Sequence, residues 1–237
     1  MEIATLGESA LIVRIRDRFA DAPEQTLNEV LAAMRCLEAA KIPGVVEFAP
    51  AYTTVAVFFD PVVVINNGVE PDRVVEYLTS KVREALMHSK EKRRKPAAAR
   101  LIEIPVCYDR EFALDINQVA EHARRSPKEV IDLHCSGDYR VSCVGFTPGF
   151  PFLSGLPAQL ATPRRATPRK EIPAGSVAIG GKQTGVYPIK SPGGWNMIGR
   201  TPLRLFNPTK DPPSLLRMGD RVRFRSITRE EFERSTP

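Results

Sequence analysis

Glycine, proline and large apolar residues alternate densely between Gly145 and Thr201. The stretch opens with Gly-Phe-Thr-Pro-Gly-Phe-Pro-Phe-Leu-Ser-Gly-Leu-Pro, and near its end it contains Ser-Pro-Gly-Gly-Trp. Proline fixes φ and removes a backbone donor, while glycine opens conformations closed to other residues, so this density specifies particular loop shapes. A solvated linker would not carry so many apolar side chains, because these gain free energy only on burial. We predict a folded site built from loops.

The length of 237 residues and the hydrophobic content of 43% allow one large domain or two small ones. Glu2 and Glu8 interrupt the region where a secretory signal would be apolar, and no stretch approaches the length of a membrane span. We therefore expect a cytoplasmic protein that does not bind membranes. The four cysteines are too scattered for a Cys-x-x-Cys metal site and too few for a disulfide framework, which favours reduced, mostly buried thiols.

The net charge of +6 raises the question of an anionic partner such as nucleic acid. One basic run, from Lys90 to Lys95, ends at Pro96 and is followed by three alanines. No aromatic residue interleaves with these charges to stack on bases. The composition is typical of a solvated linker, so we expect no nucleic-acid partner and place a linker at residues 93–100.

Residues 1–92 predict a small α/β domain. The alternation from Ile3 to Ile15 favours a hairpin, and a helix with Asp21 as its cap and Pro23 in its first turn follows. Two strands around Pro50 and a second amphipathic helix complete the domain. The economical interpretation is an α+β fold, a small antiparallel sheet with two helices on one face.

Residues 101–237 predict a mainly-β domain. A strand starts at Leu101, Asp115 can cap a helix, and Ser126-Pro-Lys-Glu129 is a capping box that opens a second helix. That helix ends at His134, and short strands with Gly/Pro turns fill the region after Ile172. We predict a compact β-barrel.

The segment from Gly175 to Lys182 superficially matches a phosphate-binding loop. Its glycine spacing fails, and Gln183 stands where a magnesium-binding Ser or Thr is required. We therefore reject an ordinary nucleotide loop. A weaker possibility stays open: backbone amides of Gly180, Gly181, Gly193 and Gly194 could form a nest for an anion.

His134 is the histidine with the most interesting position. It lies at the C-terminus of a helix, where the dipole favours the imidazolium, directly before the strand that leads into the Gly/Pro loops. A structural or capping role and a catalytic role remain equally open on the sequence alone. Cys135 and Cys143 are better explained as buried thiols than as partners of this histidine, since no third group would orient the pair.

Arginines alternate with prolines in Thr162-Pro-Arg-Arg-Ala-Thr-Pro-Arg-Lys170. Guanidinium groups on a stiff loop suit carboxylate or phosphate binding, because little conformational freedom is lost when they engage. A charged surface loop is an equally good interpretation. Arg169 is the favoured candidate because it adjoins the glycine-rich segment.

Several of these motifs, in this order, resemble one family. The matching segments are Ile104-Pro-Val-Cys-Tyr108, Ser126 to His134, Gly145 to Leu156, Thr162 to Arg169, Ile172 to Val177, Gln183 to Pro188 and Ser191 to Pro202, together with Gly7 to Leu11 and Pro43 to Tyr52. The chain resembles the B subunits of bacterial 5-oxoprolinase, a family also described as Kip-type histidine-kinase inhibitors, as allophanate hydrolase subunit 1 and as carboxyltransferase subdomains C and D. The resemblance covers nearly the whole chain.

The resemblance implies an N-terminal α/β domain and a C-terminal cyclophilin-like barrel. It implies two partner proteins, a C-type and an A-type subunit, with which the chain opens 5-oxoproline to glutamate at the expense of ATP. No metal or biotin site is evident in the sequence, and ATP is expected to be bound with or by the partner subunits. The chain alone is expected to have little activity.

The resemblance and the chemistry of a lactam together suggest roles for single residues. A lactam is a stabilised amide, so its opening calls for a general acid or base, oxyanion donors and cationic phosphate contacts. We assign His134 to proton transfer or carbonyl polarisation and Arg169 to an anionic group. The residues assigned to substrate binding are Gln183, Tyr187, Ser191, Gly193, Gly194 and Trp195.

Two other functions fit the same family. The barrel could inhibit a histidine kinase by docking on its dimerisation helices, which needs no chemistry. The chain could also serve as a carboxyltransferase or allophanate hydrolase-type subunit in urea or amide metabolism. The stoichiometry of a complex is not encoded in any motif.

Overall fold

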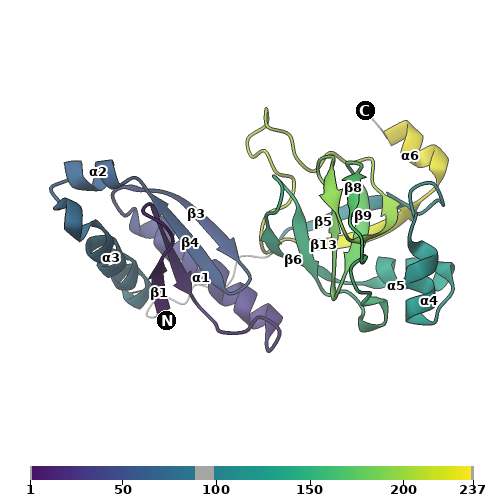
Figure 1. Ribbon diagram of the computed structural model, residues 1–237, viewed down its shortest axis with the longest axis horizontal. Helices are drawn as coiled ribbons and strands as arrows, with labels where there is room; N and C mark the ends of the chain where they lie inside the picture. Colours follow the sequence, from purple (N-terminus) through teal and green to yellow (C-terminus); the bar gives the residue numbers. More distant parts are fainter. Residues whose placement is uncertain (1, 89–98, 236–237) are drawn as a thin grey trace. The chain divides into compact units, whose positions relative to one another are not determined.

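The computed structural model describes residues 2–88 and 99–235 of the chain (Figure 1). The chain divides into two compact units, Met1–Ala98 and Ala99–Pro237. Residues 89–98 lie outside the described part, and with them most of the linker predicted at 93–100.

The first unit contains a four-stranded antiparallel sheet in the order β1-β2-β4-β3. Its strands are β1 (Glu2–Thr5), β2 (Ala10–Arg14), β3 (Val45–Ala51) and β4 (Thr54–Phe59). The predicted hairpin is β1–β2, and Gly7 takes a φ of 63° in its turn, a value that glycine adopts without strain. Pro50, which the sequence pattern places between two strands, lies inside β3.

Three helices accompany this sheet, one more than the sequence led us to expect. Helix α1 (Pro23–Ala40) packs on β3 and β4 and against α3 (Val74–His88). The prediction that Asp21 caps α1 is wrong, because the helix starts from Ala22 without a side-chain cap. The unpredicted helix is α2 (Pro61–Asn66), which Asp60 caps by accepting hydrogen bonds from two backbone amides; a short 3-10 turn, η1 (Pro71–Arg73), follows.

The second unit is built on a closed barrel, which confirms the prediction of a mainly-β fold. Seven of its described strands follow one another in the order β6-β13-β5-β12-β9-β10-β7, and β7 pairs with β6 to close the circle. Neighbouring strands are antiparallel except β13 and β5, which run parallel. The strands are β5 (Leu101–Cys107), β6 (Tyr139–Val144), β7 (Pro151–Ser154), β9 (Ser176–Gly180), β10 (Gln183–Val186), β12 (Asn196–Arg200) and β13 (Arg221–Ile227).

The interior of the barrel holds the main core of this unit. Alternate residues of the strands, such as Val177, Ile179 and Ile198, face one buried cluster, to which α4 (Ile116–Ala123) and α5 (Pro127–Ser136) also contribute. Figure 1 shows these two helices together at one end of the unit. The predicted capping box of α5 is present, since Ser126 and Glu129 exchange hydrogen bonds. The remaining helical elements are η3 (Ala158–Leu160) and α6 (Arg229–Ser235).

A second, smaller apolar cluster covers part of the barrel's outer face. The strand pair β8 (Arg169–Ile172) and β11 (Ser191–Gly193) contributes to this layer. Its buried members are Phe150, Ile172, Ala178, Tyr187, Trp195 and Met197. Strand β9 is consequently buried on both faces, and it separates the barrel interior from the outer layer.

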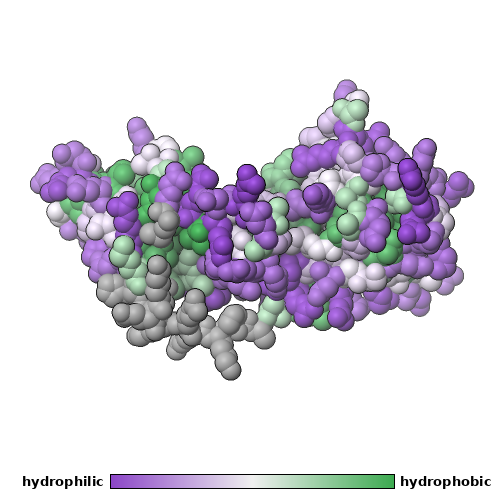
Figure 2. Space-filling model, turned by 90° about the horizontal axis from the view of Figure 1, so that it is seen from below, coloured by the Kyte–Doolittle hydropathy of each residue, from purple (hydrophilic) through white to green (hydrophobic). Residues whose placement is uncertain are grey.

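Hydrophilic residues dominate the surface of the second unit in the view of Figure 2. Apolar colour shows through only in limited areas of that face. Among the helices of the described residues, none has the length and apolar character that crossing a membrane would demand.

Candidate functional site

A β-bulge in β12 lies beside a cavity on the outer face of the barrel. Met197 pairs with Ala178 of β9 and Arg200 pairs with Ser176, but the register shifts between Met197 and Gly199. Residues three apart in a regular strand face opposite sides, and the extra residue Ile198 brings Met197 and Arg200 to the same side. Ile198 itself belongs to the interior core.

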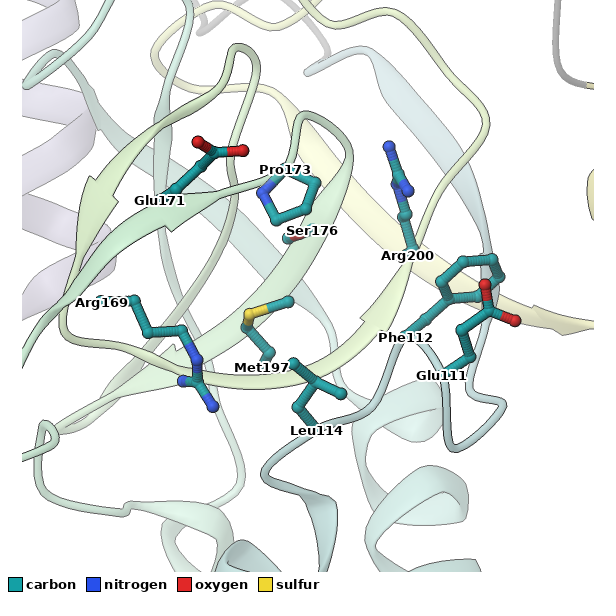
Figure 3. A pocket seen from close by; sticks show the side chains of 9 residues that line it. All are labelled: Glu111, Phe112, Leu114, Arg169, Glu171, Pro173, Ser176, Met197 and Arg200. Atoms are coloured by element: carbon teal, nitrogen blue, oxygen red, sulfur yellow. The ribbon is translucent and has the colours of Figure 1, made fainter.

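The cavity has a volume of about 140 Å³ (Figure 3). In the view of Figure 3 the Met197 side chain lies in the middle, with Arg169 and Arg200 on opposite sides of it. The lining residues are Glu111, Phe112, Leu114, Arg169, Glu171, Pro173, Ser176, Met197 and Arg200. They come from the segment before α4, from β8 and the turn after it, and from the facing positions of β9 and β12.

Beside this cavity, Asp115 holds two arginines of the Thr-Pro-Arg loop. Its carboxylate accepts two hydrogen bonds from Arg169, at 2.8 and 2.9 Å, and one from Arg165 at 2.7 Å. The backbone amide of Met197 donates a fourth at 2.8 Å. Asp115 is buried and both arginine side chains are mostly buried, so the cluster is a desolvated ion triad with one excess positive charge.

The prediction that Asp115 caps α4 is therefore only half right. Asp115 occupies the N-cap position, yet its side chain makes no capping hydrogen bond. The carboxylate turns instead to Arg165 and Arg169, which lie 50 and 54 residues further along the chain. No local pattern signals this arrangement. Arg169, which we assigned to an anionic group, already has a carboxylate partner within the chain.

The rest of the Thr-Pro-Arg loop is tied to the segment around Trp195. The backbone amide of Arg165 donates to the carbonyl of Gly194 at 2.8 Å, and the Asn196 side chain donates to the carbonyl of Pro163 at 2.9 Å. The Arg164 guanidinium lies 5.7 Å from the centre of the Trp195 ring, within the range of a cation–π contact. The loop is thus held in place along its length, as a positioned set of arginines requires.

The predicted substrate-binding residues Tyr187, Ser191 and Trp195 are all buried in or beside the outer layer. Tyr187 receives a hydrogen bond from the Trp195 backbone, and burial raises the pKa of its phenol. Tyr187 therefore stays neutral near neutral pH. The Ser191 hydroxyl is buried and has no hydrogen-bond partner among the described residues. Trp195 contacts Arg164 of the arginine loop, and none of the three residues lines the cavity.

The predicted glycine nest has a different explanation. A methyl group on Gly180 would come within 2.5 Å of the Trp195 ring, so this glycine makes room for the indole. Gly193 similarly makes room for the Tyr187 hydroxyl. The Gly181 amide donates a hydrogen bond to the Thr162 carbonyl, and the Gly194 carbonyl accepts one from the Arg165 amide. Gly180 to Gln183 form a β-hairpin between β9 and β10 rather than a phosphate loop, with Gln183 as the first residue of β10.

His134 lies on the other side of β9, in the barrel core. Its side chain is 0% exposed, and its ring stacks on Phe224 with centroids 4.3 Å apart. Burial lowers the pKa of His134 to about 3, so the ring is neutral near pH 7. The end of a helix favours the imidazolium, but here the cost of burying a charged ring outweighs that effect.

The hydrogen bonds of His134 define its tautomer. Thr184 donates its hydroxyl proton to the Ala178 carbonyl, so it can only accept from His134 Nε2, which lies 3.0 Å away. The Tyr108 hydroxyl, 2.8 Å from Nδ1, must then donate to that nitrogen. Both ring nitrogens are satisfied inside the protein, and the ring does not line the cavity. These contacts favour the structural alternative over the catalytic one.

The same residues also bear on cofactor binding. Within residues 2–88 and 99–235 no group of three metal-ligating side chains comes together. Two of the three loop arginines share the carboxylate of Asp115 as a partner, and the glycine-rich segment is a hairpin. These features do not indicate a triphosphate site among the described residues, so we assign none of them to a nucleotide. The free thiols of Cys107, Cys135 and Cys143 have pKa values raised by burial, which keeps them protonated.

Comparisons with known proteins place this geometry in a family. The B subunit of 5-oxoprolinase from Bacillus subtilis is 43% identical over 234 residues, which cover 98% of this chain and 95% of that protein. The crystal structure of TTHA0988 is 35% identical with a TM-score of 0.73; it matches 92% of this chain, which spans only 40% of that longer protein. A conserved uncharacterized protein from Pyrococcus horikoshii, PH0987, is 39% identical with a TM-score of 0.55, and 98% and 100% of the two chains are covered.

The family model named "Carboxyltransferase domain, subdomain C and D" matches residues 1–216. This match includes the Thr-Pro-Arg loop, Asp115 and the strands that form the cavity. The chain therefore belongs to the family of carboxyltransferase domains, subdomains C and D, together with proteins named as B subunits of 5-oxoprolinase.

Proposed function

We propose that this chain is the B subunit of an ATP-dependent 5-oxoprolinase, which opens 5-oxoproline to glutamate together with a C-type and an A-type subunit. One observation carries the proposal: the identity of 43% to a protein named as the B subunit of 5-oxoprolinase extends over nearly the full length of both chains. An identity restricted to the barrel would support only a shared fold.

The geometry supports a role in binding and orienting rather than in nucleotide chemistry. 5-Oxoproline is a five-membered lactam with one carboxylate, so a site for it needs a cation, a hydrogen-bonding group and an apolar surface. The outer face of the barrel presents all three within one cavity. Phosphorylation of the lactam oxygen would make the ring reactive towards water, and in this proposal the partner subunits bind the ATP for that step.

The finer features of the family belong to the same proposal. The closed mixed barrel supports the interpretation of residues 101–237 as a cyclophilin-like domain, with residues 1–92 as the α/β domain. A cytoplasmic location suits an enzyme that consumes ATP. Little activity is expected from this chain alone, because its described residues do not supply a phosphate-binding loop.

The proposal is tested by reconstitution. The purified chain is mixed with the C-type and A-type subunits, ATP and 5-oxoproline, and glutamate is measured. Release of glutamate that requires all three proteins and ATP supports the proposal. Equal release without this chain, or none with every component folded and present, would show that this chain does not belong to a 5-oxoprolinase.

A further inference from the structure

Among the charged residues lining the outer-face cavity, Arg200 is distinguished by its lack of a carboxylate partner. Glu111 pairs with Arg229, Glu171 pairs with Lys190 at 2.7 Å, and Arg169 pairs with Asp115. Arg200 uses its Nε to bond the carbonyl of Ala174 at 2.9 Å, and no carboxylate of the described residues forms an ion pair with it. Its guanidinium also lies 5.7 Å from the centre of the Phe112 ring, a contact that leaves its two terminal nitrogens available as donors.

The cavity also contains an unused hydroxyl. Ser176 is 0% exposed, and its Oγ has no hydrogen-bond partner in the described part of the chain. A buried hydroxyl without a partner is costly, so it is uncommon unless a ligand or water completes it. Ser176 pairs directly with Arg200 across β9 and β12, which places both side chains on the same face of the sheet.

Apolar side chains line the cavity together with Arg200 and Ser176. The side chains of Met197 and Phe112 are buried, while Leu114 is 56% exposed at the cavity. A cavity of about 150 Å³ is known to hold a single benzene ring, so this one, at about 140 Å³, has room for one small ring.

We propose that this cavity binds a small carboxylate with an amide or amine group, the carboxylate on Arg200 and the second polar group on Ser176. The aliphatic body of the ligand lies against Met197. Both 5-oxoproline and glutamate have this chemistry, and identifying the ligand as substrate or product rests on the function proposed above. The site itself rests on the unpaired guanidinium, the unpartnered hydroxyl and the cavity that joins them.

Binding is measured on the full-length chain by NMR, following the backbone amides of Ser176, Met197 and Arg200 during titration with 5-oxoproline, L-glutamate or 2-pyrrolidinone. We expect both carboxylates to shift these signals, and 2-pyrrolidinone, which lacks the carboxylate, to bind at least about tenfold more weakly. The tighter of the two carboxylates identifies the source of the ligand. Absence of any shift at tens of millimolar, or equal binding of 2-pyrrolidinone, would overturn the proposal.

Two substitutions assign the contacts. Arg200→Gln should weaken carboxylate binding about tenfold to a hundredfold, and Arg200→Lys should restore part of the loss. Ser176→Ala should weaken it about threefold to tenfold without loss of fold, because no internal hydrogen bond is removed. The matched control is Arg204→Gln, since Arg204 also bonds a carbonyl, that of Phe206, through its Nε but does not line the cavity.

The reconstituted complex separates this proposal from the function. If the wild-type complex releases glutamate and both variants keep the wild-type KM for 5-oxoproline, the site is wrong and the function stands. If the wild-type complex releases none while Arg200-dependent carboxylate binding persists, the function is wrong and the site stands. If the variants raise the KM for 5-oxoproline by about the factor by which they weaken binding in the NMR titration, both the site and the function are supported. A partner side chain occupying the cavity would abolish 5-oxoproline binding in the complex, and that result would overturn the proposal.

Discussion

Two hydrogen bonds join the guanidinium of Arg169 to the carboxylate of Asp115, at 2.8 and 2.9 Å. The same carboxylate also holds Arg165 and the backbone of Met197. Through these four contacts Asp115 connects the Thr-Pro-Arg loop to the strand that carries Arg200. The positions of Arg165, Arg169 and Met197 therefore all depend on the buried carboxylate of Asp115.

Asp115→Ala is expected to destabilise the protein by about 3 kcal/mol, because it leaves two mostly buried arginines without their counter-charge. The measurement is the free energy of unfolding in urea. Asp132→Ala is the control, since Asp132 forms an exposed pair with Lys128 and should cost less than about 1 kcal/mol. Similar losses in the two variants would mean that the triad contributes no more than a surface pair.

The buried His134 predicts a specific dependence of stability on pH. Its pKa is about 3 in the folded protein and ordinarily 6.5, so between these values the unfolded chain binds a proton that the folded chain does not. The contribution is fully present above pH 6.5 and is lost as the pH falls towards 3, at about 1.4 kcal/mol per pH unit. His134→Gln should remove this part of the slope in urea unfolding from about pH 7 to 4. His122→Gln, at an exposed position, should leave it unchanged.

The assigned tautomer of His134 predicts the effect of Thr184→Val. Valine has a similar shape but cannot accept a hydrogen bond, so the Nε2–H of the buried ring loses its partner. We expect a loss of about 1–3 kcal/mol in the free energy of unfolding. In the wild type, the nitrogen chemical shifts of the imidazole should show a protonated Nε2 and an unprotonated Nδ1. The opposite pattern would contradict the hydrogen-bond directions assigned to Thr184 and Tyr108.

Trp195 is the single tryptophan of the chain and reports on the outer layer. Gly180→Ala would place a methyl group 2.5 Å from its ring, so we expect the ring to shift, its fluorescence to change and stability to fall by about 1–3 kcal/mol. Gly181→Ala, at the neighbouring position, is the matched control. Its methyl group meets nothing within 4 Å, although its φ of 64° costs a non-glycine residue about 1–2 kcal/mol. Only the Gly180 variant should change the fluorescence of the folded state.

Structural elements that depend on residues close together in the chain could be predicted from the sequence. The capping box at Ser126 and the first hairpin depend on residues a few positions apart, and both are present. Helix α2 was missed because its run of β-branched residues from Val62 to Ile65 is typical of a strand. There Asp60 caps the first amides and Pro61 supplies the first turn, and together these outweigh the intrinsic preference.

The candidate site could be predicted only in part, because some of its residues are far apart in the chain and meet only in the folded protein. The motif-rich stretch does contain Arg169, Ser176 and Arg200, but Asp115 joins it only through contacts 50 to 82 residues apart in sequence. The environment of His134 is also a property of the assembled barrel. Burial decides its charge, and nothing in the residues next to it reveals that burial.

The bulge at Ile198 gives β12 one residue more than the segment of β9 with which it pairs. Deleting Ile198 would leave Met197 and Arg200 two positions apart, so they would still share a face of a regular strand. The deletion would instead remove the Ile198 side chain from the barrel interior, where Gly199 has no side chain to replace it. The extra residue thus serves the barrel core, and β12 combines an interior isoleucine with two cavity-lining side chains on its outer face.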